Sequence, residues 1–191
     1  AEQVLVALAP TSSALAAELK ARGMPVSDPK TCPIQVVPSS NLNDRLNAVG
    51  GDEALRLSGL PMLRADTSDT ARLYRQGDEQ LAVLPAVLEE DTFFVSHDPR
   101  QLMETVLNEL HLLQRHWRGE GSPLLLIPIE ATLLENNPEL LIDLTERLHS
   151  GRLADVPVCF SDLETLAHRA QWVTLPATPA RGNAHQRSDA T

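Results

Sequence analysis

The sequence predicts an α/β (or α+β) fold in which helices pack on a mixed β-sheet. Short apolar, β-prone runs alternate with helix-like segments from the start of the chain, which favours α/β layering over a helical bundle. Two β-prone runs around a glycine turn add one β-hairpin. The 191 residues, 42% of them hydrophobic, suit a single domain that buries a core. We therefore expect an α/β accessory or regulatory domain over 1–175 and a disordered tail over 176–191.

The first fifty residues predict two strand–helix pairs. Residues 4–8 form a short apolar run, which indicates a buried strand. One serine of the pair Ser12-Ser13 can cap a helix over 14–22. A second strand is expected over 34–37, and Ser39-Ser40 is expected to cap the helix that follows it.

The middle of the chain predicts the hairpin and then the longest helix. The runs 71–75 and 80–84 flank a Gly-Asp-Glu turn, and 92–95 is another candidate strand. Asp98-Pro99 combines a capping residue with a proline at the first helical position, and apolar residues then recur every three or four positions to Trp117.

A strand and two further elements complete the predicted fold. The unbroken apolar run 124–127 is typical of a central strand. Residues 137–138 repeat the cap-and-proline start for another helix, and 156–160 is a strand that Pro157 would confine to a sheet edge. The Ser-x-x-Glu pattern at 161–164 predicts a capping box for a final helix.

Charge and cysteine content exclude several classes of function. The net charge of −10 and the absence of a basic cluster argue against binding to nucleic acid or to an anionic membrane. No apolar run of eighteen residues could span a bilayer. Cys32 and Cys159 are expected to be buried free thiols, with one disulfide as the alternative. We expect a cytoplasmic protein, and the start Ala1-Glu2-Gln3 suggests a fragment of a longer chain.

Motifs that carry chemistry are scarce. The chain has no dinucleotide or phosphate loop and no hydrolase elbow. The helix start at Thr11-Ser12-Ser13 could hold an anion on its N–H groups, although ordinary capping explains it as well. His111 and His116 are five residues apart, whereas two metal ligands on one helix face need a spacing of four. We therefore predict no catalytic, cofactor-binding or metal-binding residues.

Several spaced segments form a pattern that resembles one family. The most specific segment is the junction formed by Trp117, Arg118, Gly121 and Pro123. The others are Pro33-Ile34-Gln35-Val36, Leu57-Ser58-Gly59-x-Pro61, Leu73-Tyr74, Pro128-Ile129, Gly151, Val156-x-Val158, Leu163 and Leu166. In this order they resemble the α and β regulatory subunits of phosphorylase b kinase and their bacterial glucoamylase-like relatives, which are related to glycoside hydrolase family 15.

The resemblance implies a region that follows an N-terminal (α/α)-barrel related to glucoamylase, and the acid and base of such enzymes belong to that barrel. It thus implies a non-catalytic accessory or regulatory domain in glycogen or α-glucan metabolism, with the chain's own barrel, and other subunits, as partners. Trp117, Arg118, Gly121 and Pro123 would then be structural or interaction residues. Whether the longer parent protein is itself a glucan hydrolase of this type stays open. Two alternatives remain: a free-standing module that binds a small ligand or anion, and a hydrolase fragment that retains a carbohydrate function.

Overall fold

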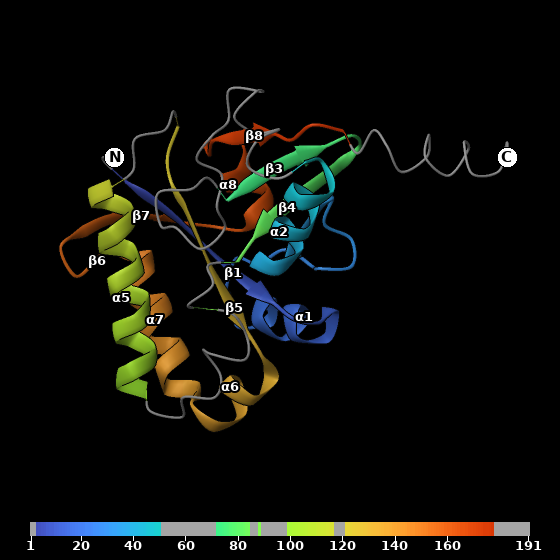
Figure 1. Ribbon diagram of the computed structural model, residues 1–191. Helices are drawn as coiled ribbons and strands as arrows, with labels where there is room; N and C mark the ends of the chain where they lie inside the picture. Colours follow the sequence, from blue (N-terminus) through green and yellow to red (C-terminus); the bar gives the residue numbers. More distant parts are fainter. Residues whose placement is uncertain (1–2, 51–71, 85–87, 89–98, 117–120, 178–191) are drawn as a thin grey trace, which may run out of the picture.

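A computed structural model describes residues 3–50, 72–84, 88, 99–116 and 121–177 (Figure 1). It confirms the α/β class, and it divides the strands between two four-stranded sheets rather than one. The first sheet has the order β5-β1-β7-β6, with β1 Val4–Pro10, β5 Leu124–Ile129, β6 Arg152–Leu153 and β7 Val156–Phe160. The second sheet has the order β2-β4-β3-β8, with β2 Ile34–Val37, β3 Leu73–Gln76, β4 Glu79–Val83 and β8 Trp172–Thr174. The helices are α1 Ser13–Ala21, α2 Ser39–Ala48, α5 Pro99–His116, α6 Ala131–Asn136, α7 Pro138–His149 and α8 Leu163–Ala167.

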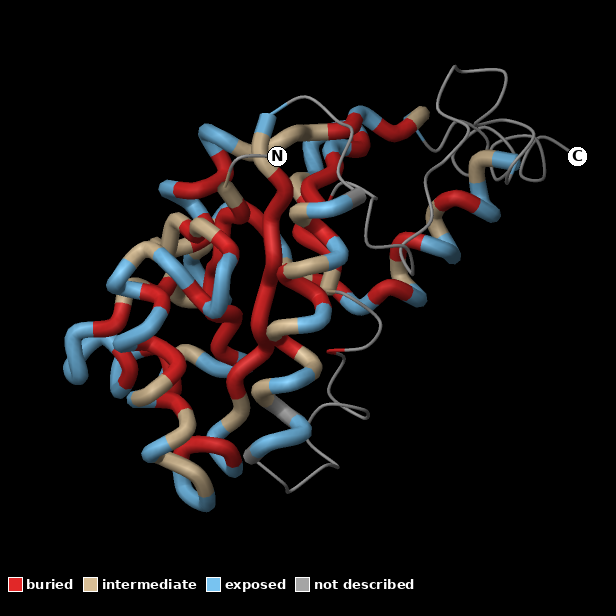
Figure 2. Tube along the Cα trace, turned by 90° about the vertical axis from the view of Figure 1, so that its left-hand side faces the viewer, coloured by how far each residue is buried: buried red, intermediate tan, exposed pale blue. Residues whose placement is uncertain are grey.

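The first sheet is built around β1, which pairs in parallel with β5 on one side and β7 on the other. All seven residues of β1 are buried, and Figure 2 shows this strand running through the middle of the molecule. Because successive side chains of a strand point to opposite faces, β1 divides its apolar residues between two cores. Val4, Val6 and Leu8 face one core, whereas Leu5 and Ala7 face the other.

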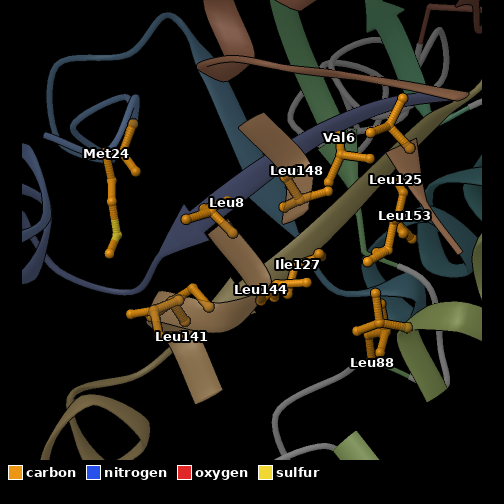
Figure 3. Close-up of a cluster of buried hydrophobic side chains, with 14 of the residues drawn as sticks. Val6, Leu8, Met24, Leu88, Leu125, Ile127, Leu141, Leu144, Leu148 and Leu153 are labelled. Carbon is orange, nitrogen blue, oxygen red and sulfur yellow. The ribbon is translucent and has the colours of Figure 1, made fainter. Parts of the chain in front are cut away.

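The larger core lies between the first sheet and the helices α1, α5, α6 and α7. Figure 3 shows Val6, Leu8, Leu125 and Ile127 of the sheet in one cluster with Leu141, Leu144 and Leu148 of α7. The helix α5 adds Val106, Leu110 and Leu113, all at most 1% exposed. The apolar stripe predicted for this helix therefore docks on the sheet, as expected. Its cap Asp98, its terminal Trp117 and the candidate strand 92–95 lie outside the described residues.

A second core joins the two sheets. Leu5, Ala7, Leu124 and Leu126 of the first sheet form one cluster with Ile34, Leu73 and Ala82 of the second sheet, and α8 contributes Leu163, Leu166 and Ala167. The opposite face of the second sheet packs on α2 through Val37, Tyr74, Leu81, Leu42 and Leu46. The order of layers is therefore helices, first sheet, second sheet with α8, and α2 (Figure 1).

The predicted hairpin is confirmed. The strands β3 and β4 pair antiparallel, from Leu73 opposite Ala82 to Gln76 opposite Glu79. Gly77 opens the two-residue loop at φ +59°, a backbone conformation that glycine adopts without steric cost. Since β2 also pairs with β4, the hairpin is the centre of the second sheet.

Two predicted strand positions are wrong. The strand β5 ends the order of the first sheet instead of occupying its centre. It is nevertheless buried, because helices cover one of its faces and the second sheet with α8 covers the other. The strand β7 lies between β1 and β6, although Pro157 predicted an edge. The N–H of Val158 donates to the Gly151 carbonyl at 2.9 Å, so the missing donor of Pro157 faces the β1 side. There, among the described residues, the pairing begins at Val4, opposite Val158.

Two predicted helix caps are also wrong. Pro38 occupies the cap position of α2 without a side-chain hydrogen bond, and Ser39 is already helical. Asp162, not Ser161, caps α8, and its Oδ2 accepts from the Thr165 N–H at 3.1 Å. With the aspartate as cap, the helix starts one residue later, and the satisfied first-turn donor is the Thr165 N–H instead of that of Glu164. The predicted cap Ser12 is confirmed, since its Oγ accepts from the Leu15 N–H.

Candidate functional site

The junction singled out by the sequence is held by close backbone packing. Trp117 and Arg118 lie outside the described residues. Gly121 has φ +69°, and a Cβ built there would lie 3.1 Å from Gln171 N, 3.2 Å from Arg169 O and 3.3 Å from Ala170 C. Both the conformation and the space therefore require glycine at this position.

The two residues after Gly121 tie the start of β5 to its neighbours. The Ser122 N–H donates to the Arg169 carbonyl at 3.3 Å, in a parallel bridge with Ala170. Pro123 is buried, and its carbonyl accepts from the Leu5 N–H at 2.9 Å. The junction thus links the first sheet to the connection between α8 and β8. These contacts support a structural role for Gly121 and Pro123.

The alternative anion site at the start of α1 is occupied by the chain's own groups. Ser12 uses its Oγ to cap the Leu15 N–H at 3.1 Å. The Ser13 hydroxyl donates to Asp28 Oδ1 at 2.6 Å. This hydrogen bond, with a second one from the Lys30 N–H, lowers the pKa of Asp28 below its ordinary value. A carboxylate of the protein therefore already lies beside this helix start, which favours ordinary capping.

The cysteines are free thiols, as predicted, but both are half-buried rather than buried. Burial raises the pKa of Cys32, so this thiol is poorly suited to nucleophilic chemistry. Cys159 accepts a hydrogen bond from Arg169 Nη1 at 3.0 Å. His111 is half-buried on α5, and the side chain of His116 lies outside the description. Among the described residues, no group of three or more His, Cys, Asp and Glu side chains could hold a metal ion.

A pocket that the sequence did not predict lies where α8 meets the second sheet. We call it the α8 pocket. Its volume is about 300 Å³, and its lining includes Ile34, Arg75, Gln80, Glu164, His168 and Trp172. Glu164 and His168 also line an adjoining polar hollow of about 520 Å³, between α8 and the segment that follows α1. Binding pockets for small molecules have volumes in this range.

Strand alternation explains why polar groups gather in the α8 pocket. Leu73 of β3 and Ala82 of β4 face the core between the sheets. Arg75 and Gln80 share that face, because each lies two positions from one of these residues on the same strand. Arg75 is paired with Gln80, and Gln80 is paired with Ile34 on the next strand. The pocket is therefore the rim at which the core between the sheets opens to solvent.

Two interactions fix the pocket's charged edge. The Arg75 guanidinium lies over the Trp172 ring, 4.2 Å from its centroid. The indole Nε1–H donates to the Ala167 carbonyl of α8 at 2.9 Å. The indole of Trp172 is half-buried and lines this pocket. Arginine stacked on a locked indole loses little freedom when it binds a ligand.

The known proteins to which the chain is similar are regulatory subunits of phosphorylase b kinase. The chain is 25% identical over 135 residues to the alpha subunit, skeletal muscle isoform, of Oryctolagus cuniculus. It is 29% identical over 135 residues to the alpha subunit, liver isoform, of Mus musculus. A probable beta subunit of Drosophila melanogaster is 24% identical over the same length. No protein-family model matches the chain.

These matches cover 70% of this chain but only 11% of each alpha subunit and 12% of the beta subunit. They support a distant and partial similarity to these regulatory subunits. The glucoamylase-like relation goes beyond these comparisons. Within the described ranges, no helix is long and apolar enough to cross a bilayer.

The residues that carry the resemblance are mostly packing residues. Ile34, Leu73, Leu163 and Leu166 all belong to the core between the two sheets. Val156 and Val158 belong to the core of the first sheet. Gly151 ends α7 at φ +84°, whereas 57–61 lies outside the described part of the chain. Where the structure describes them, these residues thus build the two-sheet architecture and do not form a set of reactive groups.

Proposed function

We propose that the chain is a non-catalytic accessory or regulatory domain of a longer protein that acts in glycogen or α-glucan metabolism. The observation that carries this proposal is the similarity to phosphorylase b kinase regulatory subunits over 70% of the chain. These relatives are named as regulatory subunits, which are components of a larger assembly. The chain spans about 11% of their length, so it corresponds to one part of such a protein.

The uses of the charged side chains support an accessory role. Asp28 accepts hydrogen bonds from Ser13 and Lys30, and Asp162 caps α8. Arg45 binds Glu79 through two hydrogen bonds of 2.9 and 3.0 Å, which tie α2 to the hairpin. These groups hold neighbouring elements together. A side chain committed to a cap or a fixed ion pair is poorly placed to transfer protons to a substrate.

The partner we propose is a glucoamylase-like barrel encoded before this domain in the same polypeptide, together with other subunits. This partner follows from the family resemblance. A domain that regulates such a barrel must contact it, and contacts between domains of one chain commonly bury 600–1,500 Å², roughly as transient protein interfaces do.

The test uses the 191-residue chain and the separately produced upstream region. Size-exclusion chromatography and calorimetric titration measure whether the two associate, and a maltooligosaccharide assay measures whether the chain changes glucan hydrolysis. We expect association, a changed rate for the barrel, and no glucose release by the chain alone. Absence of association together with an unchanged rate would reject the proposed function. Glucose release by the chain alone would instead support the hydrolase alternative.

A further inference from the structure

We propose that the α8 pocket binds a neutral sugar unit of an α-glucan. The pocket chemistry by itself selects a neutral, polyhydroxylated ligand, and the choice of an α-glucan rests on the proposed function. Of the described junction residues, neither Gly121 nor Pro123 belongs to its lining. It would make the domain a sensor or anchor for the glucan rather than only a structural support.

The hydrogen-bonding capacity of the lining matches hydroxyl groups. Arginine supplies only donors and a carboxylate only acceptors, whereas the amide of Gln80 supplies both. A sugar hydroxyl can donate and accept, so the hydroxyls of one sugar unit can bond to both Arg75 and Glu164. Ile34 and Ala167 provide an apolar wall for the C–H face of a sugar ring.

The distribution of charge disfavours anions. Arg75 and Glu164 carry opposite charges, so the α8 pocket is close to neutral. The adjoining hollow adds Asp28 and Asp162 against Lys20, and the whole chain carries −10. A phosphate or nucleotide would be repelled by these negative charges, and in the pocket lining only the Arg75 guanidinium would attract it. A neutral glucan bears no such penalty, and the hollow offers room for further sugar units beside the first.

The pocket is also held in shape before any ligand arrives. The stack of Arg75 on Trp172 and the indole hydrogen bond to Ala167 connect β3, β8 and α8. Trp172 is paired with Leu73, which is fully buried in the core between the sheets. Binding groups fixed by neighbours in this way lose less conformational entropy on binding than free side chains.

The experiment is an NMR titration of the ¹⁵N-labelled 191-residue chain with maltotriose, with the β-linked cellotriose as the control ligand. We expect saturable shifts of the Trp172 indole N–H and of the Gln80 and His168 amides with maltotriose, and weaker effects with cellotriose. Arg75→Gln should lower the affinity by about tenfold, because a charged hydrogen bond is lost. The matched control is Arg152→Gln, at an exposed position of β6. This variant should bind maltotriose with the affinity of the unmodified chain.

Three outcomes would overturn the inference. These are no saturable shift with maltotriose, equal affinity for cellotriose, and equal weakening by the Arg75 and Arg152 variants. A Lys-rich peptide that shifts the same amides while maltotriose does not would assign the surface to a polypeptide and would also overturn it. Since association with the barrel is measured separately, loss of sugar binding with intact association rejects this inference alone.

Discussion

Replacement of Gly121 by alanine tests the close packing at the start of β5. The residue has φ +69°, and a left-handed conformation costs a non-glycine residue roughly 1–2 kcal/mol. The added methyl group would lie 3.1 Å from Gln171 N and 3.2 Å from Arg169 O, which are backbone atoms that cannot rotate away. Overpacking of this kind typically costs about 1–3 kcal/mol.

One effect opposes this loss. Alanine restricts the unfolded chain more than glycine does, which returns about 0.4–1 kcal/mol. We therefore expect Gly121→Ala to lower the free energy of unfolding by about 2–3 kcal/mol. For a chain of 191 residues this corresponds to a fall in Tm of roughly 5–10 °C. Urea denaturation followed by circular dichroism measures the free energy, and calorimetry measures Tm.

Gly77 provides the matched control. It also has a positive φ, +59°, but a Cβ built there meets nothing within 4 Å. Gly77→Ala should therefore cost only the conformational part, about 1 kcal/mol or less. The difference between the two variants isolates the close approach of the backbones. Equal destabilisation by the two substitutions would refute the argument that the 169–171 segment confines Gly121.

Three further substitutions test the packing and the electrostatics. Arg72→Met should cost about 3–5 kcal/mol, because it removes the guanidinium whose Nη2 lies 3.8 Å from Oε1 of the buried carboxylate of Glu109. The double variant with Glu109→Leu should recover most of that loss. A double-mutant cycle in urea measures this coupling, and additive losses would contradict it. Leu166→Ala in the core between the sheets should cost about 2–5 kcal/mol, and Leu112→Ala, at a side chain 38% exposed, should cost far less by the same measurement. Burial tends to raise the pKa of Asp162, but hydrogen bonds from Thr165 and Ser161 outweigh it and hold the pKa below the ordinary value. A depressed folded-state pKa stabilises the protein above the unfolded pKa of about 4, and this stability is lost as the pH falls through the folded value. The cost of Asp162→Asn should therefore be largest at neutral pH and shrink in acid, and a constant cost from pH 7 to pH 2 would contradict this.

Elements with strong local patterns could be predicted from the sequence. The apolar run of β1, the three- and four-residue spacing of α5, and the Gly77 turn each act within a few residues of the chain. The position of a strand in a sheet depends instead on distant partners. The strand β5 resembled a central strand because it is buried, yet its burial comes from helices on one face and the second sheet on the other, not from a second neighbouring strand. The short strand β8 and helix α6 have too few residues to show a period.

The α8 pocket could not be predicted for the same reason. Ile34, Arg75, Glu164 and Trp172 come from four separate segments that only the pairing of the second sheet and the docking of α8 bring together. One local signal was present, since Leu73 and Arg75 alternate with Tyr74 and must share a face of their strand. This signal shows that a guanidinium lies at the end of an apolar face, but it does not show what lies opposite.

The central place of β1 in its sheet has a consequence for how the protein is made. Its neighbours are synthesised much later, and the contact of Gln3 Nε2 with the Val158 carbonyl joins positions 155 residues apart. During translation the emerging β1 must remain unpaired until most of the polypeptide has left the ribosome. Chains with many such distant pairings fold slowly, and their early apolar strands are exposed to aggregation in the meantime. Production at low temperature or with chaperones should therefore raise the yield of folded protein more than it would for a helical bundle of equal length.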